Sequence, residues 1–208
     1  MSDEREALRR RNLRTVAALA ALFLVPLTAA FLDYYATSWR PAGHVNHGRL
    51  ITPARPLPAV ALPAIRLDAP GAGATAAAAP VAALRGKWSL VYLGDGACDA
   101  DCAQALYTMR QSRLALNADM TRVARVFLVT GGVPRREFLA REHSGLTLLD
   151  ARVPAAAALT REFPAADRAH TLYVVDPLGN LLMSYDARND PHGLLEDLQQ
   201  LLRLSHIG

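Results

Sequence analysis

The chain has 208 residues, of which 51% are hydrophobic and 20% charged. This balance is too apolar for a disordered chain and too charged for a polytopic membrane protein. Lys and Arg total 23 against 19 Asp and Glu, but no basic stripe interleaved with aromatic residues appears, which argues against nucleic-acid binding. Two cysteines are too few for a disulfide scaffold or a four-cysteine zinc ribbon.

The N-terminal region contains one uncharged apolar segment, Thr15–Leu32. As a helix rising about 1.5 Å per residue, this segment nearly spans a hydrocarbon layer of ~30 Å. Tyr34, Tyr35 and Trp39 follow it, where an aromatic belt lies in membrane proteins. We predict a transmembrane helix over residues 15–32, preceded by a cytoplasmic N-terminus over residues 1–14.

Arginines are distributed unequally around this segment. Two follow it at Arg40 and Arg49, whereas five precede it, at Arg5, Arg9, Arg10, Arg11 and Arg14. The positive-inside rule therefore predicts a single-pass protein with its N-terminus in the cytoplasm and everything after Leu32 outside. We expect this membrane to be the inner membrane, with the main domain in the periplasm. A cleaved signal peptide is the alternative, since residues 28–30 offer small side chains at a cleavage position. Both alternatives place the remaining chain on the oxidising side of the membrane.

A proline-rich stretch, Pro41–Pro80, follows the apolar segment and holds seven of the thirteen prolines. Proline at this density favours extended backbone and opposes helix formation. We predict a juxtamembrane linker over residues 33–60 and a folded domain over residues 61–208, with one short edge strand within Ala61–Asp68.

The chain after residue 86 alternates between apolar runs and amphipathic stretches. Short apolar runs bounded by turn residues predict buried strands, and apolar spacings of three and four predict helices. The order β-α-β-α-β-β-α favours an α/β fold with a thioredoxin-like central sheet and flanking helices, preceded by the transmembrane helix and a Pro/Ala-rich linker. Strands are expected at Trp88–Leu93, Val123–Thr130, Leu146–Leu149, His170–Val175 and Leu181–Tyr185, and helices at Asp101–Asn117, Pro154–Phe163 and after the N-cap Asp190.

The two cysteines, Cys98 and Cys102, stand between the first buried strand and its helix in the spacing C-x-x-x-C. Residues four apart at a helix start lie on one face, with Cα atoms roughly 6 Å apart, a separation that a disulfide tolerates. The free N–H groups of a first helical turn stabilise a thiolate. Two soft thiolates this close also suit Cu(I). A structural disulfide and two incidental cysteines remain alternatives.

Three carboxylates surround the cysteine pair, at Asp95, Asp99 and Asp101. Negative charge near a thiol raises its pKa and favours a bound cation. These carboxylates could equally serve only to cap the helix.

The histidines provide further candidate ligands. His44 and His47 form an H-x-x-H pair that could be a second metal site or two loop residues. His143, His192 and His206 lie near the ends of predicted elements, so we expect them to be solvated.

Four segments of the chain form a further pattern: Gly86-Lys87-Trp88, Leu93-Gly94, the C-x-x-x-C pair and the turn at residues 176–179. Together they resemble the Sco/SenC family of cytochrome-oxidase assembly proteins. Members of that family are membrane-anchored thioredoxin folds. The resemblance implies that Cys98 and Cys102 bind copper together with a distant histidine. It also implies that the protein helps to assemble the binuclear copper centre of cytochrome c oxidase subunit II.

The chain differs from the family pattern at the position of that histidine, which falls on Arg168. His170 follows two residues later, and a shift of two along a strand keeps a side chain on the same face. The resemblance therefore implies a copper site formed by Cys98, Cys102 and His170. Two functions other than copper-site assembly remain open: a periplasmic thiol–disulfide oxidoreductase that uses Cys98 and Cys102, and a redox-inactive scaffold.

Overall fold

The structure is a computed structural model that describes residues 2–36, 46–67, 78–79, 84–205 and 207. The chain divides into two compact units, Met1–His44 and Val45–Gly208. The first unit contains the helix α1 (Ser2–Ala36). Residues Arg9–Tyr35 of this helix are long and apolar enough to cross a membrane, and an 18-residue window within them has a mean hydropathy of 2.3. The predicted span Thr15–Leu32 lies within this segment.

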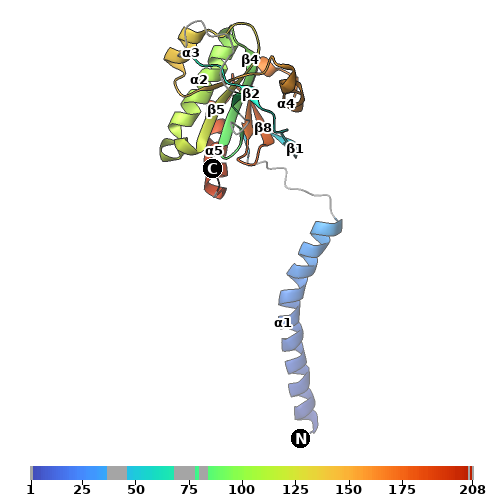
Figure 1. The fold of residues 1–208 in the computed structure, drawn as a ribbon. Helices are drawn as coiled ribbons and strands as arrows, with labels where there is room; N and C mark the ends of the chain where they lie inside the picture. Colours follow the sequence, from blue (N-terminus) through green and yellow to red (C-terminus); the bar gives the residue numbers. More distant parts are fainter. Residues whose placement is uncertain (1, 37–45, 68–77, 80–83, 206, 208) are drawn as a thin grey trace. The chain divides into compact units, whose positions relative to one another are not determined.

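The second unit is built on a mixed sheet (Figure 1). In the described part of the chain its strand order is β1-β8-β7-β4-β5-β6. β4, β5 and β6 run parallel, whereas β7, β8 and β1 each pair antiparallel with their neighbour. The strands are β1 (Arg49–Pro56), β4 (Trp88–Asp95), β5 (Val123–Gly131), β6 (Thr147–Asp150), β7 (Thr171–Val175) and β8 (Asn180–Asp186).

Helices cover both faces of this sheet. One face packs against α2 (Ala100–Ala115) and α5 (Pro191–Leu204), whose buried residues share a core cluster with Tyr92 and Phe127. The other face packs against the turn η3 (Pro154–Ala156) and α4 (Ala157–Glu162). The predicted α/β class and thioredoxin-like arrangement are thus confirmed. The remaining short helices are η2 (Asn117–Arg122), α3 (Arg136–Glu142) and η4 (Arg168–His170).

The central position of β4 explains why its sequence is a continuous apolar run. β4 pairs with β5 on one side and β7 on the other, and helices cover both faces. Its first six residues, Trp88 to Leu93, are all buried. A strand buried on both faces has no solvent side to carry alternating polar residues. Its C-terminal end, where the cysteines follow, is therefore fixed by the core.

Two segments differ from the sequence expectations. β1 lies within the stretch predicted as linker over residues 33–60, and it forms the edge of the main sheet by pairing with β8. Its exposed residues and two prolines follow no strand-like alternation, which is tolerated only at an edge. Within the expected Ala61–Asp68 edge strand, β2 (Leu62–Pro63) pairs with β3 (Ala78–Ala79) in a separate small sheet. The same segment meets the edge of the main sheet only through an isolated antiparallel bridge between Ala64 and Leu149 of β6.

His143 is buried rather than solvated, because α3, which the periodicity did not predict, ends against the core. The residue is 2% exposed, and its ring lies 5.2 Å from the Phe138 ring, centroid to centroid. Burial, together with the nearby charges of Arg110 and Arg125, lowers the pKa of His143 to about 4, while Glu142 acts weakly in the opposite direction. His143 is therefore a neutral core residue at pH 7.

This burial predicts a pH-dependent stability. The His143 pKa falls from 6.5 to about 4 on folding, so between these values only the unfolded chain binds the proton. The free energy of unfolding should therefore fall as the pH drops, by about 2 kcal/mol from this group between about pH 8 and pH 5. Urea titrations followed by the fluorescence of buried Trp88 measure this fall. Between the same two pH values, the free energy of unfolding of His143→Phe should fall by about 2 kcal/mol less than that of wild type. His192→Gln, which changes an exposed histidine, should show the same fall as wild type. Equal pH slopes for all three proteins would contradict the assignment.

Candidate functional site at the cysteine pair

Cys98 and Cys102 form a disulfide at the junction of β4 and α2. Their Cα atoms are 5.0 Å apart, close to the separation expected from the C-x-x-x-C spacing. Cys102 lies in the first turn of α2, whereas Cys98 precedes the helix with φ of 46°, in the left-handed region. Both residues are buried, at 1% and 2% exposure. The predicted proximity of the two cysteines is thus present in the structure.

Backbone hydrogen bonds hold the loop that carries Cys98. The Gly96 N–H donates to the Gly131 carbonyl at 2.9 Å, and the Arg135 N–H donates to the Gly96 carbonyl at 3.0 Å. A Cβ atom on Gly96 would lie 2.9 Å from the Pro134 nitrogen, closer than real Cβ contacts. Glycine is therefore required where the loop after β4 meets the loop after β5. The Arg135 guanidinium also donates to the Cys98 carbonyl at 3.2 Å.

Each of the three flanking carboxylates has a local partner. Asp99 is the N-cap of α2, and its Oδ1 accepts from the Cys102 N–H at 3.0 Å. Asp95 Oδ1 accepts from the Ala97 N–H at 2.8 Å. Asp101 Oδ2 instead lies 3.0 Å from Nε2 of His170. Capping therefore explains Asp99, while Asp101 connects the helix that carries Cys102 to His170.

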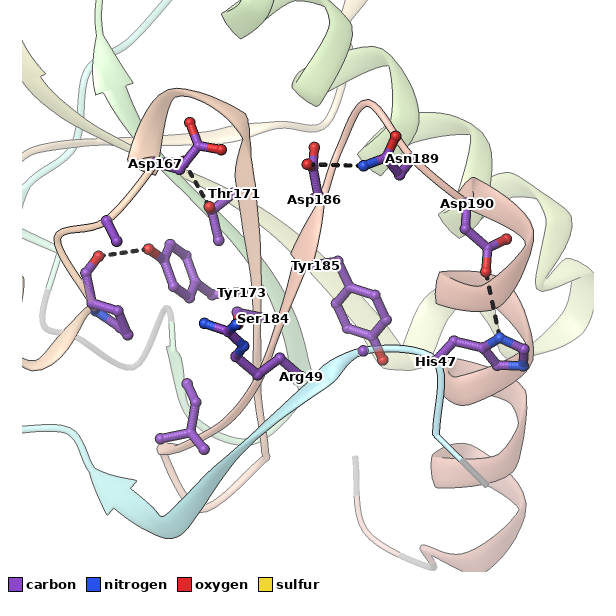
Figure 2. A pocket seen from close by; sticks show the side chains of 14 residues that line it. His47, Arg49, Asp167, Thr171, Tyr173, Ser184, Tyr185, Asp186, Asn189 and Asp190 are labelled. Atoms are coloured by element: carbon purple, nitrogen blue, oxygen red, sulfur yellow. Dashed lines mark hydrogen bonds and ion pairs between the residues drawn. The ribbon is translucent and has the colours of Figure 1, made fainter. Parts of the chain in front are cut away.

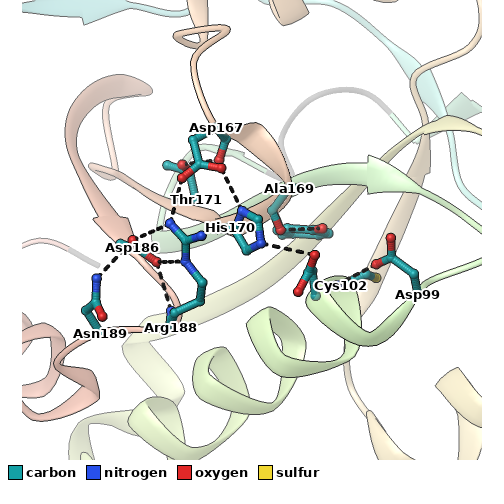
Figure 3. Close-up of polar contacts among 11 residues, drawn as sticks. Asp99, Cys102, Asp167, Ala169, His170, Thr171, Asp186, Arg188 and Asn189 are labelled. Carbon is teal, nitrogen blue, oxygen red and sulfur yellow. Dashed lines mark hydrogen bonds and ion pairs between the residues drawn. The ribbon is translucent and has the colours of Figure 1, made fainter.

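His170 lies in the turn η4 and not in a strand, so strand alternation does not set its direction. Its Nδ1 is 2.6 Å from Asp167 Oδ1, while its Nε2 is held by Asp101. The hydrogen bond to Asp167, opposed by partial burial and Arg188 but helped by Asp101, raises the pKa of His170. Arg188 also bridges Asp167 and Asp186, at 2.8 and 2.7 Å (Figure 3). The result is a charged network beside the cysteine pair.

Arg168, which stands at the histidine position of the resembled family, is fixed by backbone carbonyls. Its Nε donates to the Pro164 carbonyl and its Nη2 to the Thr160 carbonyl, each at 3.0 Å. A guanidinium that stays protonated cannot coordinate a metal. In this structure Arg168 therefore fastens the segment before β7 to the end of α4.

A cavity of about 260 Å³ reaches Cys102. The Tyr92 hydroxyl lies in its lining and donates to the Ala169 carbonyl at 3.0 Å. Burial, followed by the charges of Asp99 and Asp101, raises the pKa of Tyr92, so the phenol remains protonated. The cavity thus gives a small ligand or a thiol a route toward one of the two sulfurs. The other lining residues are Leu93, Gly94, Asp95, Asp99, Thr130, Arg168 and Ala169.

The structure brings His170 to the helix of Cys102 through Asp101, but both of its ring nitrogens face carboxylates. Among the described residues, no group of three or more His, Cys, Asp or Glu side chains has the arrangement of a metal site. His47 is held by Asp190 and Glu196, at 3.4 and 2.8 Å. Its H-x-x-H partner His44 lies outside the described residues, as does His206.

A second hollow, of about 440 Å³, lies over β7 and β8 and contains no cysteine (Figure 2). Arg49, Tyr173 and Tyr185 contribute to its lining. The Tyr185 hydroxyl donates to buried Asp197 at 2.7 Å, and the same carboxylate oxygen accepts from the N–H groups of His47 and Gly48. These contacts hold the beginning of the second unit against α5. The polar residues of this hollow therefore have a structural role.

Comparisons with known proteins agree with this architecture. The model of the family described as transmembrane-like, thioredoxin-like, C-terminal domain matches residues 88–205. Similar solved structures include apo Sco1 from Thermus thermophilus (18% identity, 77% of this chain and 99% of the other covered, TM-score 0.58). Yeast Sco1 with copper bound is also similar (15%, 72% and 93%, TM-score 0.58).

A third similar structure is BsSco, a member of the Sco family of cytochrome c oxidase assembly proteins in which a disulfide switch was identified. It is 15% identical and covers 76% of this chain and 99% of its own, with a TM-score of 0.53. A comparison with curated proteins gives no match. At these identities the similarity establishes the fold, as the resemblance to Sco/SenC proteins predicted.

The site geometry predicts how the cysteines react. Because Cys98 and Cys102 are joined and buried, neither should be alkylated by iodoacetamide in the folded, air-exposed protein. After reduction by a dithiol reagent both should be alkylated. Mass spectrometry of peptides from non-reduced protein should recover the two cysteines as one linked species. Free alkylation of both cysteines before reduction would contradict the assigned disulfide.

Proposed function

The chain belongs to the family of transmembrane-like, thioredoxin-like C-terminal domains, and on this premise we propose that it is a membrane-anchored factor for assembly of the copper site of cytochrome c oxidase. One observation carries the proposal: a cysteine pair joined as a disulfide lies at the junction of β4 and α2, with a cavity reaching Cys102. The thioredoxin-like fold around this pair is shared with Sco proteins, one of which was solved with copper bound. The partner proposed for this chain is subunit II of the oxidase.

Cu(I) is the proposed cargo of the reduced pair. Reduction of the Cys98–Cys102 disulfide takes two electrons and two protons, which a partner dithiol supplies as it becomes a disulfide. The two thiols then lose their protons as the sulfurs bind one Cu(I). Thiolate sulfur is a soft ligand that prefers Cu(I), and Cα atoms 5.0 Å apart keep both sulfurs within reach of one ion.

His170 is the proposed third ligand. Its Nε2 lies 3.0 Å from Asp101, one residue before Cys102 in the same helical turn. Coordination would require Nε2 to exchange Asp101 for copper, while Nδ1 keeps Asp167 as its partner. A carboxylate on the distal nitrogen fixes the orientation and tautomer of a ligating imidazole. Asp167 is therefore suited to support His170 as a ligand.

Thiol–disulfide exchange is the second candidate function, and one observation favours it. When the cysteines are joined, both ring nitrogens of His170 contact carboxylates and neither nitrogen is available to a metal. The arrangement with the disulfide formed is therefore complete without a metal ligand. In this case the pair would transfer two electrons and two protons to or from a partner's cysteines and bind no cargo. A scaffold that uses neither reaction is the remaining alternative.

Removing the His170 imidazole tests the copper proposal. We expect His170→Ala to raise the dissociation constant for Cu(I) at least tenfold, equivalent to about 1.4 kcal/mol, because one of three ligands is lost. The reduced full-length protein in detergent micelles is titrated against a chromophoric Cu(I) chelator. His192→Ala is the matched control, since His192 also pairs with a carboxylate but its side chain is exposed on the surface of α5.

The rate of disulfide reduction by a small dithiol separates the candidates. It should be similar in wild type and His170→Ala, because exchange needs only the two sulfurs. Unchanged copper affinity in His170→Ala would remove the three-ligand site. Absence of Cu(I) binding by the reduced wild type, with exchange retained, would favour the oxidoreductase.

The proposed location is the inner membrane, with the second unit in the periplasm. The arginine excess before α1's apolar segment supports this orientation. We expect the protein to stay in the membrane after alkaline carbonate extraction. In spheroplasts, added protease should degrade the domain that contains Trp88. Recovery of a soluble form that starts near Phe31 would instead identify a cleaved signal peptide.

A further inference from the structure

We propose that the groove between α2 and α3 is the docking surface for an acidic segment of the partner protein, one that carries an aromatic or aliphatic side chain. This groove encloses about 480 Å³, and its lining includes Ala100 and Ala103, which stand on either side of Cys102 in the sequence of α2. The inference deepens the proposed function and rests on it for the role of the partner. The groove itself is defined by contacts that involve neither sulfur.

Apolar and aromatic side chains form part of the groove lining, beside the polar Gln104. Ala100 and Ala103 come from the first turns of α2, Tyr107 from the turn after them, and Phe138 from α3. Tyr107 is 49% exposed, and within the described residues of the second unit it is the only aromatic side chain among the large exposed hydrophobic ones. An aromatic ring left half exposed at the mouth of a groove is available for contact with a partner.

Guanidinium groups border these rings. Arg110 lies 5.7 Å from the centroid of the Tyr107 ring, and Arg135 lies 4.9 Å from that of Phe138. Arg141 also lines the groove, with its side chain 78% exposed. Aromatic faces covered by guanidinium groups form surfaces that accept both apolar and anionic groups.

The charges around the groove do not cancel. Glu142 is the one carboxylate in the lining, 2.9 Å from the Arg141 Nε and 3.9 Å from an Arg110 nitrogen. Hydrogen bonding to Arg141 in particular lowers the pKa of Glu142, so it is ionised at pH 7. His143, with a pKa of about 4, adds no positive charge at that pH. Within the lining, the two guanidinium groups of Arg110 and Arg141 outnumber the one carboxylate, and Arg135, over Phe138, adds a further positive charge beside it. The groove is therefore net positive, which complements an acidic segment.

The groove and the cysteine pair share structural elements. Ala103 follows Cys102 directly in α2, and Arg135, which covers Phe138, donates to the Cys98 carbonyl at 3.2 Å. A segment seated in the groove would therefore place its neighbouring residues next to the disulfide. On the other side of the pair, the carboxylates of Asp101 and Asp167 are paired with His170, and Asp167 is also paired with Arg188. The excess of guanidinium groups on the groove side therefore sets how an acidic partner approaches.

A peptide-binding experiment tests this inference. The probe is a fluorescein-labelled acidic peptide of sequence EDFLED, compared with the basic KKFLKK and with EDGSED, which lacks large apolar residues. Fluorescence anisotropy is measured with the oxidised, copper-free, full-length protein in nanodiscs of neutral lipid, against empty nanodiscs. Neither copper nor thiol exchange takes part, so this result is independent of the test of the proposed function.

Saturable binding of EDFLED is expected, at least tenfold tighter than that of either comparison peptide and weakened by raising the salt concentration. Tyr107→Ala and Arg141→Glu should each raise its dissociation constant at least tenfold. Leu178→Ala and Arg161→Glu are the matched controls, since both positions are exposed but lie outside the groove. Thermal unfolding shows whether each variant folds, and Arg141→Glu changes only an exposed side chain. Absence of EDFLED binding, equal binding of KKFLKK, or wild-type affinity in both groove variants would overturn the proposal.

Discussion

The backbone contacts of Gly96 fix the geometry on which the candidate site depends. Two hydrogen bonds join Gly96 to Gly131 and Arg135, and the approach of Pro134 leaves no room for a Cβ atom. This clamp joins the loop after β4 to the loop after β5. It sets the position of Cys98 relative to the first turn of α2, and it also sets the beginning of α3. The disulfide and the groove beside it therefore depend on one packing constraint.

Asp101 connects this clamped junction to the antiparallel half of the sheet. His170 immediately precedes β7, and its ring joins Asp101 on α2 to Asp167. Arg188, after β8, closes the network by binding Asp167 and Asp186. The His170 imidazole thus links α2 to the segment before β7, two parts of the chain that are far apart in sequence. An imidazole whose two nitrogens both contact carboxylates has a fixed orientation. One of these carboxylates must release its nitrogen before that nitrogen can bind a metal.

The sequence predicted the helices and strands whose pattern of apolar residues matches the faces that they bury in the fold. The continuous apolar run of β4 and the leucine stripe of α5 reflect burial directly, and Asp190 caps α5 as expected. α3 was not predicted, because a single seven-residue helix buries only Leu139 and shows no periodicity. β1 was not predicted, because its pairing with β8 is interrupted and its residues are mostly exposed. The turn at His170 depends on Asp167 in a left-handed conformation, which propensity does not reveal.

The two flanks of the cysteine pair differ in charge, and this difference relates the proposed chemistry to the proposed recognition of a partner. Carboxylates at Asp99, Asp101 and Asp167 favour a cation near the sulfurs, whereas the arginines along α2 and α3 favour an acidic protein surface. In the proposed function, the carboxylate side would attract a copper ion and the guanidinium side an acidic partner protein. The ion and the partner would then reach the sulfurs from different sides, as transfer of a copper ion or an electron pair between two proteins requires.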